Sequence, residues 1–112
     1  MVTPQITIGT TPAKLYDLLK GRTPPVGASI SAAYPEIQNG CQILILEGDP
    51  ANAGSIFTGG SSGVSSTNKG LTILAGDRLL LQGGSGKNTI ELGFWIVASE
   101  PGQILNVTVI YG

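Results

Sequence analysis

The sequence predicts an all-β domain, an antiparallel sandwich or barrel, and three observations lead to this fold class. Its 112 residues include 17 glycines and seven prolines, which divide the chain into segments too short for most helices. Short runs of β-branched and apolar residues lie between these breaks, at the spacing typical of sandwich strands. The clearest run, over residues 103–111, alternates apolar and polar side chains with the period of two of a half-buried strand.

The pattern of each run predicts which face it buries. Leu105, Val107 and Val109 share one face of the last run and should point into the core, because the intervening positions are polar. In the run from Thr89 to Ala98, one face is apolar and the other also carries Trp95 and Val97, so we expect cover on both faces. The first face holds Ile90, Leu92, Phe94 and Ile96, and the second holds Glu91, Gly93, Trp95 and Val97. Trp95 on the second face is expected to contact a partner. In chain order, strands are predicted near Gln5–Ile8, Ala28–Ala32, Gln42–Glu47, Gly70–Ile73, Arg78–Gln82, Thr89–Ala98 and Gln103–Tyr111.

The segment Thr11–Lys20 has two equally supported interpretations. Leu15, Leu18 and Leu19 recur at helical spacing, which favours one short helix near residues 12–20 with Thr11 as its cap and Gly21 at its end. A strand is the alternative. The following Pro24 and Pro25 predict an extended connection, since proline cannot donate a ladder hydrogen bond.

Composition limits the size and the partners of the domain. A chain of 112 residues builds one modest core, so residues 1–112 are expected to form a single domain. Charged residues make up only 12%, against roughly 25% in an average soluble domain, and such a surface favours contact with other protein. The net charge of −1 comes from singly spaced residues, so no basic stripe predicts nucleic-acid binding.

Neither membrane insertion nor secretion is predicted. No apolar run approaches the roughly 18 residues of a membrane span, and the first residues do not resemble a signal peptide. We expect assembly in a cytoplasm.

Cysteine and histidine usage argues against catalysis. Cys41 is the single cysteine and opens an apolar run, so a small buried side chain is the expected role. Without any histidine, nucleophilic and acid–base chemistry lack their usual base. Glu47, Asp49 and Asp77 lie in turn sequences, which account for them without a glycosidase-like or calcium site. The sequence therefore predicts neither an enzyme nor a cofactor or metal site.

Two glycine-rich segments are candidates for ligand binding. The segment Gly83–Thr89 resembles a phosphate-binding loop, but Leu81 stands where the motif needs glycine and Asn88 where it needs serine or threonine. A hairpin turn is expected there instead. The segment Gly59–Gly63 predicts a mobile loop tip, with contact to a sugar or partner as the functional alternative.

Residues 41–110 carry a resemblance in three motifs of consistent order. The strand Ile43–Leu46 ends in Glu47-Gly48, the stretch Gly63–Asp77 reads Val-Ser-x-x-x-x-Gly followed by Leu-Ala-Gly-Asp, and Phe94–Ser99 contains Ile-Val-Ala-Ser. In these features the chain resembles small tailed-phage virion proteins. The segment Pro50–Gly63 is longer than the turn expected in such proteins.

The resemblance implies a jelly-roll-like sandwich and a structural role. It implies a bacteriophage capsid decoration (cement) subunit, or a head-fibre component, on the virion surface, with the major capsid protein as partner and a homotrimer as the favoured state. We expect residues 1–10 to form a partner-binding arm, because an apolar strand beside a chain end can add to a neighbouring sheet. A chain without this arm should then fold but not bind shells. The expected partner-binding residues are Val2, Thr3, Pro4, Gln5, Ile6, Thr7, Ile8 and Trp95.

Two other function classes remain open. A tail-fibre or head-fibre module that binds a receptor or carbohydrate would place Tyr34, Trp95 or Tyr111 on an exposed platform. An enzyme would need a pocket with perturbed carboxylates, and no sequence feature locates one.

Overall fold

The structure, a computed structural model, describes residues 1, 3–22, 27–30, 37–83 and 90–111. The one helix in this part of the chain is α1 (Leu15–Leu19), and it is too short to cross a membrane. The strands are β1 (Gln5–Ile8), β2 (Ala13–Lys14), β3 (Ser29–Ile30), β4 (Gly40–Cys41), β5 (Ile43–Gly48), β6 (Ile56–Gly59), β7 (Leu71–Ile73), β8 (Arg78–Gln82), β9 (Ile90–Glu91), β10 (Trp95–Ala98) and β11 (Gln103–Ile110).

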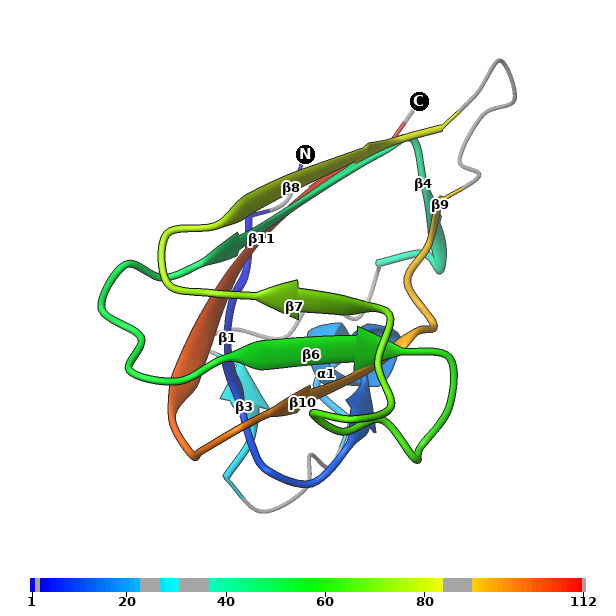
Figure 1. Cartoon of the computed structure of the whole chain (residues 1–112). Helices are drawn as coiled ribbons and strands as arrows, with labels where there is room; N and C mark the ends of the chain where they lie inside the picture. Colours follow the sequence, from blue (N-terminus) through cyan, green and yellow to red (C-terminus); the bar gives the residue numbers. More distant parts are fainter. Residues whose placement is uncertain (2, 23–26, 31–36, 84–89, 112) are drawn as a thin grey trace.

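Two antiparallel sheets pack face to face, and β4 and β9 form a small separate ladder (Figure 1). The first sheet has the order β3-β1-β11-β5-β8, and the second has the order β2-β10-β6-β7. We call them the five-stranded and the four-stranded sheet. The chain is thus the all-β antiparallel sandwich that the sequence predicts.

The strand order is that of a jelly roll. Its eight principal strands form nested antiparallel pairs, β1 with β11, β2 with β10, β5 with β8 and β6 with β7. Successive pairs alternate between the two sheets, as in a long hairpin rolled around a core, which is the jelly-roll arrangement. The predicted jelly-roll-like topology is confirmed.

Alternating side chains of both sheets meet in one core. On β11, Leu105, Val107 and Val109 are buried as predicted, and Leu44 and Leu46 alternate in the same way on β5. The four-stranded sheet contributes Ile56, Ile73 and Ile96, all without exposed surface. Burial of these branched side chains is the main stabilising contribution to the sandwich.

The strand predicted over residues 89–98 is interrupted. Only β9 and β10 are strands, because the chain between them bonds to another element. The carbonyl oxygens of Leu92 and Phe94 accept hydrogen bonds from the amides of Tyr16 (2.9 Å) and Leu15 (3.1 Å). These bonds join the small ladder to the start of α1. The expected cover on both faces holds for β10, where Ile96, Val97 and Ala98 are all buried.

Strand β6 corrects the interpretation of Pro50–Gly63 as an insertion. Ile56–Gly59 is an inner strand of the four-stranded sheet, paired with β10 and β7. The loop before it is fixed by Asn52, whose side-chain amide donates to the Ile104 carbonyl and accepts from the Ile104 amide, both at 2.8 Å. The other predicted strands agree with the structure within one or two residues, apart from 31–32 and 89, which lie outside the described residues.

Both interpretations of Thr11–Lys20 are partly correct. Ala13 and Lys14 pair with β10 as β2, and α1 follows directly. Thr11 does not cap the helix, because the N-cap position falls on Lys14, which makes no side-chain capping bond. The three leucines are buried and Gly21 follows the helix with φ of 71°, as the pattern predicts.

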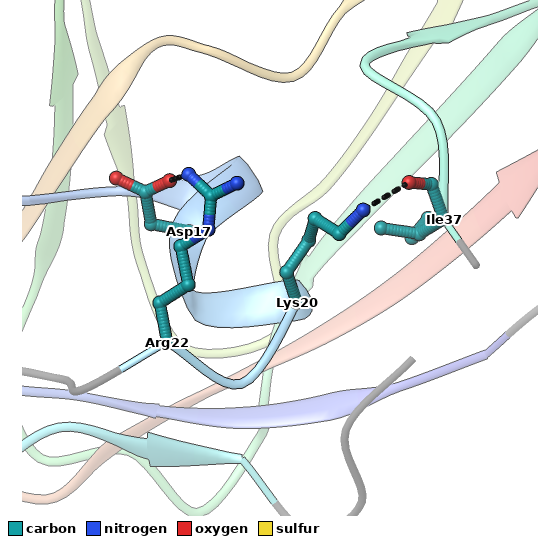
Figure 2. A network of polar contacts seen from close by, with 4 residues as sticks. All are labelled: Asp17, Lys20, Arg22 and Ile37. Atoms are coloured by element: carbon teal, nitrogen blue, oxygen red, sulfur yellow. Dashed lines mark hydrogen bonds and ion pairs between the residues drawn. The ribbon is translucent and has the colours of Figure 1, made fainter. Parts of the chain in front are cut away.

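Side chains beyond α1 fasten its C-terminal end (Figure 2). Arg22 forms an ion pair of 2.9 Å with Asp17, and the Lys20 ammonium donates to the Ile37 carbonyl at 3.4 Å. The Lys20 ammonium also lies over the Tyr16 ring, 5.4 Å from its centroid, and the Arg22 guanidinium lies 5.8 Å from it. Because the ion pair is exposed, its contribution to stability is small.

The N-terminal segment is part of the sheet rather than a free arm. Strand β1 lies between β3 and β11, and Ile6 and Ile8 are buried in the core. Removing residues 1–10 would take out an inner strand and expose the core. The expectation that a truncated chain stays folded is therefore corrected.

The turn between β7 and β8 shows why two sequence motifs carry glycine and aspartate: the Glu47-Gly48 motif and the Leu-Ala-Gly-Asp motif of residues 74–77. The Asp77 carboxylate accepts from the Leu74 amide at 2.9 Å, and the Gly76 amide donates to the Gly48 carbonyl at 2.8 Å. Gly76 has φ of 80°, a conformation that favours glycine. A Cβ atom on Gly48 would collide with the Leu74 carbonyl, so the last residue of β5 must be glycine.

We predict that Gly48→Ala lowers the free energy of unfolding by about 1–3 kcal/mol, because the backbone of the turn has to move. Urea denaturation measures the change. Gly60→Ala is the matched control: a Cβ atom there meets nothing within 4 Å. Equal stability of the two variants would contradict the close approach.

Candidate functional site

The outer face of the five-stranded sheet carries a polar row across three strands. The Asn106 carboxamide accepts from Gln5 Nε2 at 3.0 Å and donates to Glu47 Oε1 at 3.2 Å and Asp49 Oδ1 at 3.3 Å. Arg78 lies next to Glu47 on the neighbouring strand. These cross-strand contacts stabilise the sheet at its surface.

Beyond this row the same face is mixed, with Thr108 and Gln82 beside several apolar side chains. Ile45 lies directly opposite Leu80 on β8, and Ile43 lies opposite Ile110 on β11. The three isoleucines are half-buried, whereas Leu80 is 60% exposed. A binding partner would therefore meet hydrocarbon at this end of the sheet.

Exposed leucines concentrate in the β7–β8 corner, by which we mean residues 71–82. Leu71, Leu74 and Leu80 are 43%, 50% and 60% exposed. Apart from Met1, they are the large apolar side chains that the described part of the chain exposes. Leu80 lies opposite Ile45 on the outer face of the five-stranded sheet, whereas Leu71 lines a small hollow with Leu46 and Leu81. The three leucines are thus close in sequence, and each offers exposed hydrocarbon to a protein partner.

The outer face of the four-stranded sheet is covered by the chain itself. Val64, from the loop between β6 and β7, packs on Phe57 and Val97, and the partly buried Trp95 completes this cluster. The Lys14 ammonium lies 5.6 Å from the centre of the Trp95 ring. The predicted partner of Trp95 is thus in large part this chain's own loop, although part of the ring stays exposed.

That loop is tied together by its own hydrogen bonds. Ser65 and Asn68 exchange backbone bonds of 2.9 and 3.3 Å, and the Asn68 side chain donates to the Gly63 carbonyl at 3.0 Å. The Gly63 amide in turn donates to Ser61 Oγ at 3.3 Å. These bonds hold the Gly59–Gly63 segment in a defined turn. The sequence predicts a mobile tip here but does not predict this turn.

A hollow of about 480 Å³ lies beside this loop. Gly59, Gly60, Asn68 and Lys69 line it together with Phe94. The size is that of a small-ligand pocket. The Asn68 amide is already engaged in the loop, and the other polar side chains of the lining are those of Thr58, Ser61 and Lys69.

The predicted arm residues have different environments. Ile6 and Ile8 are buried, and the Pro4 carbonyl accepts from the Val107 amide at 2.9 Å, so these positions hold the sheet together. Thr3 and Gln5 are exposed and Thr7 is half-buried. Contact with a partner stays a prediction for these three, and Val2 lies outside the described residues.

The two described aromatic residues of the predicted platform do not form one. Trp95 lies on β10, whereas Tyr111 follows β11 in the other sheet. The Tyr111 hydroxyl accepts from the Gln38 amide at 2.9 Å and donates to the Gln38 carbonyl at 3.2 Å. Tyr34 and most of the Gly83–Thr89 turn lie outside the described residues.

The carboxylates considered for catalysis or metal binding have structural contacts. Asp77 holds the β7–β8 corner, and Asp49 Oδ2 accepts from the Ala51 amide at 3.0 Å, in a turn typical of aspartate. Glu47 belongs to the polar row. In the described ranges, no group of three or more metal-ligating side chains comes together.

Cys41 is buried on β4, as the sequence predicts. Burial away from water raises the pKa of the Cys41 thiol, since the charged thiolate loses solvation. The thiol therefore stays protonated and packs as an apolar group.

Comparison with known proteins gives no match: no family model, curated protein or solved structure matches this chain.

We predict that iodoacetamide alkylates Cys41 many-fold more slowly in the folded protein than in urea, at about pH 8. The raised pKa leaves less thiolate in the folded state, and burial blocks access. Mass spectrometry of the alkylated chain over time gives both rates. The neutral thiol stabilises the folded state at pH values below the usual thiol pKa of about 8.5. This contribution is lost as the pH rises through the raised pKa that Cys41 has in the folded protein. Equal alkylation rates in the two states would contradict a buried thiol.

Proposed function

We propose that this chain is a structural subunit of a bacteriophage particle, a decoration or cement subunit that binds the major capsid protein shell. It would act on the outside of the capsid, after assembly in the host cytoplasm. On this proposal the work is adhesive: the subunit buries surface on the shell and stabilises it, without a chemical step.

The observation that carries the proposal is the β7–β8 corner. Three exposed leucines lie within ten residues, on a chain with only 12% charged residues. Burying such side chains against a shell is favourable by about 25 cal/mol for each Å² removed from water. Low charge also limits repulsion among many copies on one particle.

The architecture and the motifs support the same role by analogy. Jelly rolls recur in viral capsid proteins, although the fold also serves lectins and other functions. The motif residues Gly48, Gly76 and Asp77, on which the resemblance to phage virion proteins rests, meet at this corner. They hold the backbone that presents Leu74.

Shell binding would use Leu74 first, because its side chain is exposed while its backbone is fixed by Asp77. The exposed positions of the N-terminal segment, Thr3 and Gln5, are a second proposed contact. The trimer implied by the resemblance belongs to the same proposal and concerns subunits bound to the shell, where the number of copies at each binding position tests it.

A carbohydrate-binding module of a tail or head fibre is the second candidate. The hollow beside Phe94 favours it, because an aromatic ring and a glycine-rich loop are suited to a sugar face. A glycan array distinguishes the two: specific binding that Phe94→Ala abolishes would support the module.

We predict that the protein co-sediments with shells of its own phage from which it has been stripped, and raises their melting temperature. Leu74→Asp should weaken binding about tenfold, equivalent to about 1.4 kcal/mol, because a carboxylate replaces a buried contact. Ser62→Asp is the control, with the same charge change on an exposed loop. Absence of co-sedimentation by the folded wild-type protein would overturn the proposal.

A further inference from the structure

Strand β8 forms an open edge of the five-stranded sheet. It pairs with β5 on one side, and no described strand pairs with its other side. Figure 1 shows β8 along the upper margin of the molecule. Arg78, Leu80 and Gln82 are all exposed, so this edge is accessible.

The hydrogen-bond pattern shows which backbone groups the edge presents. The Gly83 amide donates to the Gln42 carbonyl at 2.7 Å, and the Gly48 amide donates to the Asp77 carbonyl at 2.9 Å. In an antiparallel ladder, residues that bond to the partner strand alternate with residues that face away. Leu79 and Leu81 therefore face β5, whereas the amides and carbonyls of Arg78, Leu80 and Gln82 point outward.

The sequence of this edge is self-complementary. Arg78-Leu79-Leu80-Leu81-Gln82 is symmetric in character about Leu80. If a second copy pairs antiparallel about this centre, Leu80 meets its own copy and Arg78 meets the copy's Gln82. All three outward-facing residues then bond in both directions. In the registers centred on Leu79 or Leu81, one of the three has no partner within the copy's β8.

Packing favours the same register, and charge is compatible with it. Arg78 lies opposite a neutral amide that accepts from its guanidinium, so no like charges face each other. Leu79 lies opposite the copy's Leu81 on the inner face, where both are only half-buried in one chain. Leu81 also lines a small hollow of about 130 Å³ with Leu46, Leu71 and Phe94, at the margin that the copy would cover.

We propose that two copies of this chain pair through β8, in an antiparallel two-fold register centred on Leu80, and so join their five-stranded sheets. An interface that uses the same patch on both copies closes at two chains. This proposal does not rest on shell binding, because it concerns the isolated protein, and it differs from the three-fold arrangement that the resemblance implies.

Analytical ultracentrifugation of the purified full chain over a concentration series tests the pairing. We expect a reversible dimer of twice the 11.4 kDa chain mass. Leu80→Lys should raise the dissociation constant about tenfold or more, because two ammonium groups would lie opposite each other. Leu74→Lys, the same change at an exposed leucine outside β8, should leave the dimer intact.

Further variants at Gln82, Leu80 and Leu74 test the register and guard against misfolding. Gln82→Glu should tighten the dimer by facing Arg78 of the copy, and Gln82→Lys should weaken it, while the side chain stays exposed in either case. Leu80→Cys should form a disulfide-linked dimer on mild oxidation, since opposite Cα atoms in a ladder lie within disulfide range, whereas Leu74→Cys should not. A monomer at every concentration, a trimer, or a dimer that Leu80→Lys leaves unchanged would overturn the proposal.

Discussion

Strand β11 pairs with β1 on one side and β5 on the other, so a segment near each end of the chain and one from its middle meet in a single ladder. Because Leu105, Val107 and Val109 alternate with polar or half-buried positions, a slip of one residue would turn them outward and place Asn106 in the core. The register of β11 thus determines those of β1 and β5, and β3 and β8 follow at the two edges. The polar row centred on Asn106 exists only in this register.

The alternation that fixes β11 also made it the most predictable element of the sequence. Strand β6 was missed for the opposite reason: Ile56, Phe57 and Thr58 are all buried, so no alternation marks them, and glycine and serine on either side are typical of loops. The environment of Trp95 was unpredictable in a different way. Its cover comes from Val64, more than thirty residues away, and only the return of the loop over the sheet brings them together.

The two sheets differ in how their outer faces are used. The loop between β6 and β7 covers much of the four-stranded sheet, so that face is largely satisfied within one chain. No described strand pairs with the outer side of β8 in the five-stranded sheet, and the outer face of this sheet has leucine and isoleucine at one end and the polar row at the other. Sequence patterns predicted the strands that form this surface. They did not predict its asymmetry, which depends on where the loop folds.

Cys41 is the only cysteine of the chain, and it is buried with its thiol kept protonated by the surrounding apolar side chains. The sandwich is therefore held by non-covalent contacts, with no disulfide within the chain. Its stability should not depend on whether the surroundings are reducing or oxidising. A domain built in this way needs no oxidative maturation, and the same packing holds it in either redox environment.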